Sequence, residues 1–311
     1  MQPTPMIEAL GLQKNYGDTQ AVKGVDLRVY PGEIFGFLGP NGAGKTTTIK
    51  MLIGLLRPTV GVARIGGYDV QSQPLQAKAL IGYAPDQPYL PEKLTAREYL
   101  QFVAGLYRLA PDEAQRRGEE LLRLFDLDDR GDEYVGGYSH GMRQKAALAG
   151  ALLHNPQAFF LDEPTVGLDP RSARLIKDIL REVAGRGTAV FLTTHILEIA
   201  ERMCDRVAII NDGRVIAAGT VDELRAGQTG ASLEDVFMRL TGGAEEAEIA
   251  AALECGRRGT GRWGTRMTRI GGIRGDRGDR DWGCVGTSGC GVHDRCALTP
   301  AVFICVNLRT T

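Results

Sequence analysis

The chain has 311 residues, of which 43% are hydrophobic and 24% are charged, and its formal net charge at pH 7 is −1. This is an ordinary globular balance with room for one large domain or two small ones, and the charge gives no reason to expect binding to nucleic acid or an anionic membrane. The sequence shows no apolar run of the roughly 18 residues that a membrane-spanning helix needs and no N-terminal signal peptide pattern, so we expect a cytoplasmic protein.

The N-terminal part is predicted to form two strands, at residues 7–12 and 22–30. Apolar residues alternate in the second run, as they do in a half-buried antiparallel strand. Residues 14–18 between them form a predicted turn that carries Tyr16. The Tyr16 ring is either an ordinary turn residue or a surface on which a purine base can stack.

The stretch GPNGAGKTT, residues 39–47, lies between an apolar strand-like run at 34–38 and an apolar, helical run at 49–56. This order of strand, glycine-rich loop and helix predicts a phosphate-binding loop, and a glycine-rich turn that binds nothing is the alternative. Glycines let the backbone point its N–H groups at an anion, and the helix N-terminus adds positive charge. Lys45 is then expected to reach the β- and γ-phosphates, and the Thr46 hydroxyl to ligate Mg²⁺. The predicted phosphate-binding residues are Gly39, Pro40, Asn41, Gly42, Ala43, Gly44, Lys45, Thr46 and Thr47.

Short strands are predicted at residues 59–74, and a further strand begins at residue 81 and ends at Pro85. The next stretch, residues 91–155, is predicted to be an all-helical insertion in an α/β frame. Thr95 with Glu98 forms a capping box that begins a helix through about residue 109. A second helix begins at Pro111, and the third has Ser139 as its N-cap and stops at an Asn-Pro pair.

A buried strand predicted at residues 158–164 ends in two acids, Asp162 and Glu163. An acid at this place holds Mg²⁺ in phosphate-loop NTPases, and the second carboxylate can orient or deprotonate an attacking water. Two solvated acids at a strand end are the alternative. His195 follows the predicted strand at 188–194, at the end where open α/β sheets gather ligands, although a lone histidine is more often structural.

The remaining elements complete the predicted domain. Asp169 caps a helix that ends near Gly185, and Asn211-Asp212-Gly213 predicts a hairpin. Two short helices follow, capped by Thr220 and Ser232.

Over about residues 5–240 these motifs, in this order, resemble those of the ATP-binding subunit of an ABC transporter. GPNGAGKTT resembles the Walker A loop, FFLDEP the Walker B strand, YSHGMRQK at 138–145 the family signature, GLDP at 167–170 the D-loop and TTH at 193–195 the switch histidine. The resemblance implies that Glu163 and His195 are catalytic and that Thr46, Asp86 and Asp162 serve Mg²⁺. It also implies that the nucleotide is contacted by Tyr16, Ser139, Gly141, Met142 and Asp169 as well as by the Walker A loop.

Two positions depart from the family pattern. Asp86 stands where glutamine is usual, and we expect it to act on Mg²⁺ through a water, with Gln87 as the rival. In the signature, His140 and Met142 replace the commonest glycine and glutamine, which leaves the strength of its phosphate contact open.

The resemblance implies an α/β fold: a P-loop NTPase core with an antiparallel β subdomain and an inserted helical subdomain. It implies ATP binding and hydrolysis that energise export through a separate membrane permease, with the chain peripheral on the inner face of the membrane. Two copies, or this chain and another ATP-binding subunit, would enclose ATP and Mg²⁺. The closing sequence SLEDVFMRLTG resembles one-domain subunits of drug, lipid or polysaccharide exporters, so we expect the permease to handle a small-molecule or lipid-like substrate.

The alternative function is a soluble ABC ATPase that acts on ribosomes or nucleic acid. Such proteins usually have two ATP-binding halves and a charged linker, and this sequence contains one phosphate loop and one signature. The near-neutral charge also argues against nucleic acid as a partner.

Residues 244–311 form a Gly-, Arg- and Cys-rich tail without periodicity, which we predict to be disordered. Cys284, Cys290, His293 and Cys296 offer four zinc ligands, but their spacing is not that of the usual zinc fingers. An unstructured or out-of-frame extension is the plainer interpretation.

Overall fold

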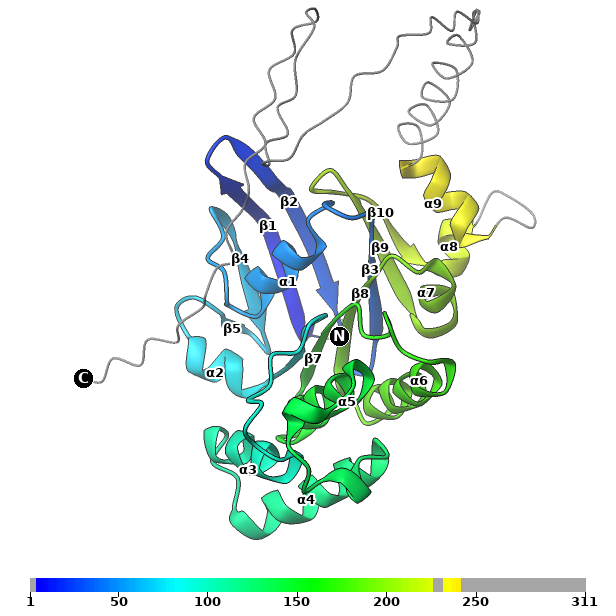
Figure 1. The fold of residues 1–311 in the computed structure, drawn as a ribbon. Coiled ribbons are helices and arrows are strands. Elements are labelled where there is room, and N and C mark those ends of the chain that lie inside the picture. The colour runs from blue at the N-terminus through cyan, green and yellow to red at the C-terminus, as the bar shows by residue number, and fades with distance from the viewer. Residues whose placement is uncertain (1–3, 226–231, 242–311) are drawn as a thin grey trace, which may run out of the picture. The chain divides into compact units, whose positions relative to one another are not determined.

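The computed structural model describes residues 4–225 and 232–241, and within them two sheets are covered by helices (Figure 1). Four strands form an antiparallel sheet in the order β2-β1-β4-β5. Six form the second sheet in the order β10-β9-β3-β8-β7-β6, in which all neighbours are parallel except the edge pair β9 and β10. The predicted combination of a P-loop core, an antiparallel β part and a helical insertion is confirmed.

The antiparallel sheet begins with a long hairpin of β1 and β2. Its two strands pair as far as Tyr16 and Thr19, so only Gly17 and Asp18 form the turn. The prediction that Tyr16 lies in the turn was therefore wrong: it ends a strand, because the ladder continues beyond the apolar residues that the pattern detects. The strands of this sheet are β1 (Ile7–Tyr16), β2 (Thr19–Val29), β4 (Val60–Ile65) and β5 (Tyr68–Asp69).

The central strands of the second sheet read as continuous apolar runs because both of their faces are covered. Every residue of β3, β7 and β8 is buried. The strands are β3 (Ile34–Leu38), β6 (Ile81–Ala84), β7 (Ala158–Asp162), β8 (Ala189–Thr194), β9 (Arg206–Asn211) and β10 (Arg214–Thr220).

Most helices begin at the caps that the sequence predicts. Thr95 and Glu98 form the full capping box of α3, Ser139 accepts from the Met142 N–H at the start of α5, and Asp169 caps α6. The helices are α3 (Ala96–Leu106), α4 (Pro111–Leu124), α5 (His140–Leu152), α6 (Pro170–Gly185), α7 (Leu197–Met203), α8 (Val221–Arg225) and α9 (Leu233–Thr241).

Two helices differ from the prediction. The helix after the glycine-rich loop, α1 (Lys45–Leu52), begins four residues before the expected 49, since the left-handed Gly44 is its N-cap and Lys45 already belongs to its first turn. The six-residue α2 (Pro74–Ala79) was not predicted. It has a single buried residue, Ala77, and therefore shows no helical pattern in the sequence.

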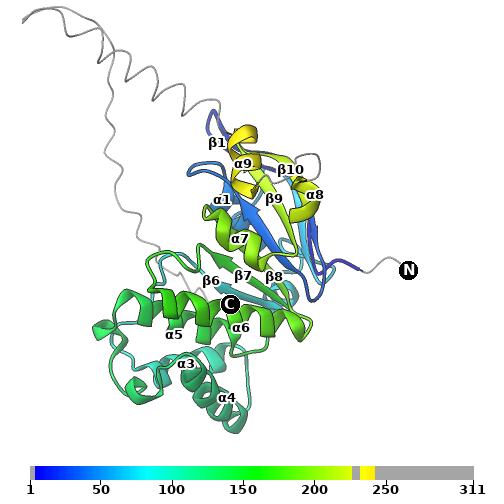
Figure 2. The ribbon, with the colours of Figure 1, turned by 90° about the vertical axis from the view of Figure 1, so that its right-hand side faces the viewer.

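The parallel sheet separates two apolar cores. In β3, Ile34 and Leu38 face the core shared with α3–α6, whereas Phe35 and Phe37 face the core shared with α1 and the antiparallel sheet. Phe191 of β8 packs in the second core, with its ring 5.5 to 5.7 Å from those of its aromatic neighbours. Figures 1 and 2 show α3 and α4 at the end of the molecule away from the β1–β2 hairpin, so the parallel sheet lies between two different subdomains.

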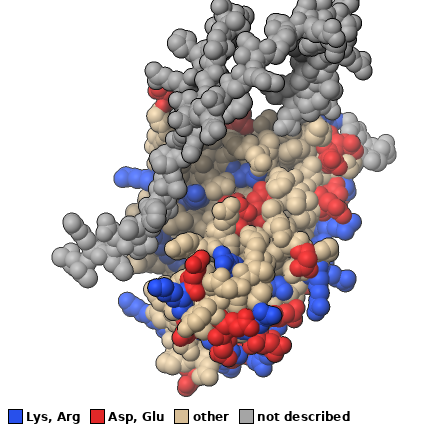
Figure 3. All heavy atoms as spheres, in the orientation of Figure 1, with Lys and Arg blue, Asp and Glu red and all other residues tan. Residues whose placement is uncertain are grey.

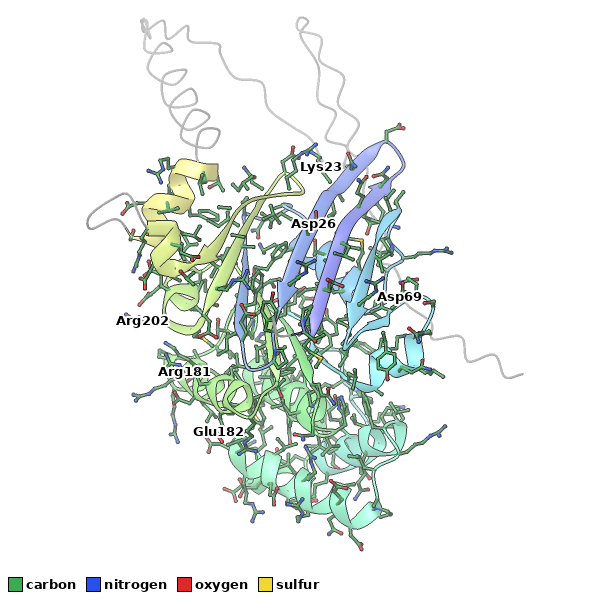
Figure 4. The ribbon with its side chains drawn as sticks, turned by 180° about the vertical axis from the view of Figure 1, so that it is seen from behind. Lys23, Asp26, Asp69, Arg181, Glu182 and Arg202 are labelled. Atoms are coloured by element: carbon green, nitrogen blue, oxygen red, sulfur yellow. The ribbon has the colours of Figure 1, made fainter. Side chains whose placement is uncertain are left out.

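Polar contacts join the outer elements to this frame. Lys23 of β2 forms an ion pair with Asp212 and its N–H donates to the carbonyl of Gly213, which ties the antiparallel sheet to the β9–β10 hairpin (Figure 4). Arg181 of α6 donates to the carbonyl of Arg202 at 2.6 Å and joins α6 to α7.

Among the described residues, none of the helices has the length and apolar character needed to cross a membrane. The predictions for residues 244–311, including the zinc ligands, lie outside the described residues.

Candidate active site

Four neighbouring strands of the parallel sheet end at the same edge. They lie in the order β3, β8, β7 and β6, and each is followed by residues that the sequence singles out. The glycine-rich loop follows β3, His195 follows β8, Glu163 follows β7 and Asp86 follows β6. Because parallel strands bring their carboxyl ends together, residues more than 100 positions apart meet at one site.

The glycine-rich loop fits closely against other backbone. A Cβ on Gly44 would lie 2.8 Å from the carbonyl oxygen of Ala21, and a Cβ on Gly39 would lie 2.4 Å from that of Ile210. Gly44 also has a φ of 103°, which is strained for any residue with a side chain. No side chain caps α1. The positive end of this helix is therefore free to face an anion in the loop.

Lys45 is held inside the loop rather than in solvent. Only 7% of the residue is exposed, and its Nζ donates to the carbonyl oxygens of Gly39 at 2.7 Å and Pro40 at 3.3 Å. The same Nζ lies 3.5 Å from Oε1 of Glu163. The Lys45 ammonium group is thus fixed at the mouth of the loop. It is paired with the carboxylate of Glu163, which follows β7, two strands away from β3 in the sheet.

Glu163 connects this lysine to the histidine. Its Oε2 lies 2.9 Å from Nδ1 of His195, so one carboxylate contacts both partners. Its backbone φ is 51°, a left-handed conformation that is uncommon for residues other than glycine. Strained residues of this kind cluster at functional sites, where the surrounding structure must hold them.

Asp162 is almost fully buried, at 3% exposed, beside Glu163. Its Oδ1 accepts a hydrogen bond of 2.6 Å from the hydroxyl of Thr193, the residue opposite it in the register of β7 and β8. The sequence analysis included Thr193 in the TTH motif but gave it no role of its own. In the sequence, the only feature that could have indicated a role for Thr193 is its place two residues before His195. That place does not reveal that Thr193 lies opposite Asp162.

Asp86 enters the site from the loop after β6. Partial burial and the Asp162 and Glu163 carboxylates raise the pKa of Asp86, and His140 and His195 oppose that rise. Burial, Asp162 and Asp86 likewise raise the pKa of Tyr83, a lining residue that the sequence analysis also missed. The carboxylates of Asp86, Asp162 and Glu163 thus lie near one another at this edge, where a divalent cation would relieve their mutual repulsion.

These groups surround a cavity of about 500 Å³, within the usual size range of small-molecule sites. Its oxygen donors, the Thr46 hydroxyl and the carboxylates of Asp86, Asp162 and Glu163, suit Mg²⁺. Among residues 4–225 and 232–241, no group of three or more His, Cys, Asp or Glu is arranged to hold a metal alone. This fits Mg²⁺, which is usually bound through one or two carboxylates together with substrate phosphates. The lining residues are Ala21, Pro40, Asn41, Gly42, Gly44, Lys45, Thr46, Thr47, Lys50, Tyr83, Pro85, Asp86, Gln87, Asp162 and Glu163.

Several predicted site residues are not among those that line the cavity: the nucleotide contacts Tyr16, Gly39, Ala43, Ser139, Gly141, Met142 and Asp169, and the catalytic candidate His195. Tyr16 is half exposed, with the Lys14 Nζ 5.4 Å from its ring centroid. Ser139 caps α5, and the N-terminus of α5 packs on the loop before α6. A Cβ on Gly141 would lie 3.3 Å from Leu168.

Basic and acidic side chains are mixed over the face shown in Figure 3. Where the described residues form that face, the mixture differs from the continuous basic stripe that marks a nucleic-acid-binding surface.

Comparison with known proteins identifies the family. Residues 22–166 match the ABC transporter family model. The chain is 44% identical over 232 residues to the daunorubicin resistance ATP-binding protein DrrA3 of Streptomyces coeruleorubidus, covering 75% of this chain and 73% of the relative. It is 37% identical over 235 residues to the Nod factor export ATP-binding protein I of Paraburkholderia xenovorans, covering 76% of this chain and 77% of that protein.

A solved structure also matches the fold. It is a dimeric, post-hydrolysis state of the ATP-binding cassette MJ0796 bound to ADP and Pi, with a TM-score of 0.64 and 26% sequence identity. The match covers 69% of this chain and 98% of the cassette.

Proposed function

The chain belongs to the ABC transporter family of ATP-binding subunits, and from that premise we propose which of its residues bind and hydrolyse ATP and which partners it serves. It is an ATP-hydrolysing subunit that energises export through a separate permease, and the alternative role on ribosomes or nucleic acid is not favoured. The observation that carries the residue assignment is the contact of Glu163 with both Lys45 and His195 at the mouth of the glycine-rich loop.

The phosphates of ATP would lie on the N–H groups of residues 39–47, with Lys45 on the β- and γ-phosphates. When bound, Mg²⁺ would neutralise charge on these phosphates, and the Thr46 hydroxyl and the Asp162 carboxylate are the groups that would hold it. Asp86 would act on the cation through a water, because its side chain is one methylene shorter than glutamine. Tyr16 would stack on the adenine.

Glu163 is the proposed general base. A water oxygen attacks the γ-phosphorus, its proton passes to the Glu163 carboxylate, and the bond from that phosphorus to the bridging oxygen breaks to leave ADP and phosphate. His195 would orient Glu163 through the 2.9 Å contact and approach the γ-phosphate. The displacement of Lys45 from Glu163 toward the phosphates would free the carboxylate for this role.

A second copy, or another ATP-binding subunit, would complete the site. Ser139, Gly141 and Met142 do not line the cavity of their own chain, and in the proposed arrangement they contact the nucleotide of the partner. Asp169 would lie at the same contact. The dimeric state of the cassette MJ0796 supports this arrangement.

The partner in the membrane is a permease, and the chain would be peripheral on the inner face of that membrane. The relatives named for daunorubicin resistance and Nod factor export support a small-molecule or lipid-like compound as the exported substrate. The permease would select that compound, because the cavity of this chain is built for phosphates.

Glu163→Gln tests the assignment. The variant should bind ATP, lose about 10²- to 10⁴-fold in turnover, and accumulate as a two-copy complex with ATP on size exclusion. His195→Ala should slow turnover without blocking binding. Glu198→Gln, an exposed acid on α7, is the matched control and should keep the parent rate. If Glu163→Gln hydrolyses ATP at the parent rate, Glu163 is not the base.

A further inference from the structure

One buried hydroxyl contacts both of the adjacent acids at the end of β7. Thr193 is fully buried in β8 and lies directly opposite Asp162 in the parallel register. Its Oγ1 donates to Oδ1 of Asp162 at 2.6 Å and accepts the N–H of Glu163 at 3.2 Å. A single side chain therefore contacts the carboxylate of one acid and the backbone of the next.

We propose that Thr193 is a positioning residue of the ATPase site, which fixes the Asp162 carboxylate for the cation and the Glu163 backbone for the general base. This inference rests on the proposed function of those two acids. It gives a role to a residue that does not line the cavity.

The first half of the role concerns Asp162. A hydroxyl has one proton to donate, and here it is committed to Oδ1 in a short, charge-assisted hydrogen bond. That bond restricts rotation of the carboxylate and leaves Oδ2 as the oxygen for a cation. Without it, a buried carboxylate would lose its hydrogen bond from Thr193 and could turn away from the position that a divalent ion requires.

The second half concerns Glu163. Its left-handed φ of 51° costs energy that neighbouring contacts must offset. The Glu163 N–H is shared between Oγ1 and the carbonyl oxygen of Thr193, each at 3.2 Å. Both acceptors belong to one residue, so the strained peptide is held against β8, and the side chain of Glu163 is directed toward Lys45 and His195.

The chain provides a matched control just before the same strand. Thr188 precedes β8 at its amino end, and its hydroxyl donates to the carbonyl oxygen of Pro156 before β7 at 2.9 Å. The hydroxyls of Thr193 and Thr188 thus each donate one hydrogen bond between the same two segments, at opposite ends. A merely structural hydroxyl would affect stability alike at either end, whereas a positioning role belongs to Thr193 alone.

The experiment compares Thr193→Val, Thr193→Ser and Thr188→Val in the full chain. Mn²⁺ bound in the presence of ADP is measured directly by electron paramagnetic resonance, and ATP affinity is measured with and without Mg²⁺. Thr193→Val should weaken Mn²⁺ binding about ten-fold, the scale of one hydrogen bond to a charged group. Its ATP affinity without Mg²⁺ should stay at the parent value, and its turnover should fall. Thr193→Ser should restore metal binding, and Thr188→Val should lower only the melting temperature.

Unchanged Mn²⁺ binding in Thr193→Val, or the same loss in Thr188→Val, would overturn the positioning role. Thr193→Ala removes the same hydroxyl without placing a methyl group against the Asp162 carboxylate, and it takes the place of the valine variant if that variant does not fold. Failure of the proposed function gives a different result: the parent chain itself would then bind no Mn²⁺ with ADP and would not hydrolyse ATP.

Discussion

The carboxyl edge of the parallel sheet and the helices α3–α5 hold their functional residues in different ways. At the sheet edge, the Glu163 carboxylate directly contacts both Lys45 and His195, and Asp162 is fixed by a neighbouring strand. Asp162 ends β7, Glu163 and His195 directly follow strands, and Lys45 begins α1 after the loop that follows β3. Their relative positions follow from the hydrogen-bond register of the sheet.

The helices present Ser139, Gly141 and Met142 by another route. They pack on the sheet through an apolar core, and two polar groups meet the sheet at a single acceptor, the carbonyl oxygen of Ile81 in β6. His154 Nε2 lies 2.9 Å from this oxygen and the Tyr107 hydroxyl 3.3 Å from it. The two rings stack with their centroids 3.6 Å apart.

The difference indicates how each region would respond to change. Residues fixed by register and charge lose function abruptly when one partner is removed, because the remaining charge is left unpaired. Residues carried by a packed helix tolerate small shifts, since apolar contacts have no strict direction. The variants below test this contrast, in order of decreasing expected effect.

Lys45→Ala should have the largest effect, because it removes the ammonium group that is held in the glycine-rich loop and paired with Glu163. ATP affinity should fall by about 10- to 100-fold, the scale of hydrogen bonds to charged groups, and turnover should be lost. Equilibrium binding of a fluorescent ATP analogue measures the affinity, and phosphate release measures the turnover. Lys78→Ala, an exposed lysine on α2, is the control. Parent-like ATP affinity in Lys45→Ala would contradict the placement of the phosphates.

The second test breaks the junction of the helices with the sheet. Burial lowers the pKa of His154 from 6.5 to about 4. The unfolded chain then binds the proton more readily, so stability should be lost as the pH falls from about 6.5 toward 4. His154→Phe keeps a ring there but cannot bind a proton. It should lose about 1 kcal/mol at pH 7 and show a weaker fall in acid.

Urea unfolding at pH 7 and pH 4.5 measures both quantities. Tyr107→Phe is the matched control, because it removes the other hydrogen bond to Ile81 and leaves His154 to titrate. Equal acid sensitivity in the parent and in His154→Phe would show that another group causes the loss.

The smallest effect is expected at Asp86, whose loop joins the two regions. Its raised pKa means that the ionised form is disfavoured in the fold, so its contribution to stability falls as the pH rises above 3.8. Asp86→Asn should therefore stabilise the chain at pH 7 by about 0.5 kcal/mol, the scale of an exposed charge pair, and less at pH 4. Thermal unfolding at both pH values measures the change, with the exposed Glu92→Gln as control.

Asp86 should also set the Mg²⁺ requirement. Asp86→Ala should raise the Mg²⁺ concentration for half-maximal ATPase rate, whereas Asp86→Gln should be tolerated and Gln87→Ala should matter less. Both residues line the cavity. A raised requirement only in Gln87→Ala would assign the role to Gln87.

Local patterns were enough for much of the fold. The capping residues Thr95, Ser139 and Asp169 act where the sequence predicts, because a cap depends on residues two or three positions apart. The strand ends that carry Glu163 and His195 were also found, since fully buried strands are continuous apolar runs. The short α2 and the end of β1 at Tyr16 were missed, because neither has an apolar pattern of its own.

The sequence by itself determined the family and the residues proposed to carry the chemistry: the loop at 39–47, the acid pair and the histidine. Only the tertiary structure decided how they contact one another. The contact of Glu163 with Lys45 and His195, and the bond from Thr193 to Asp162, depend on the order and register of β3, β8 and β7. That order brings together residues over 100 positions apart, and no local spacing encodes it, because strand neighbours are chosen by the packing of both cores at once.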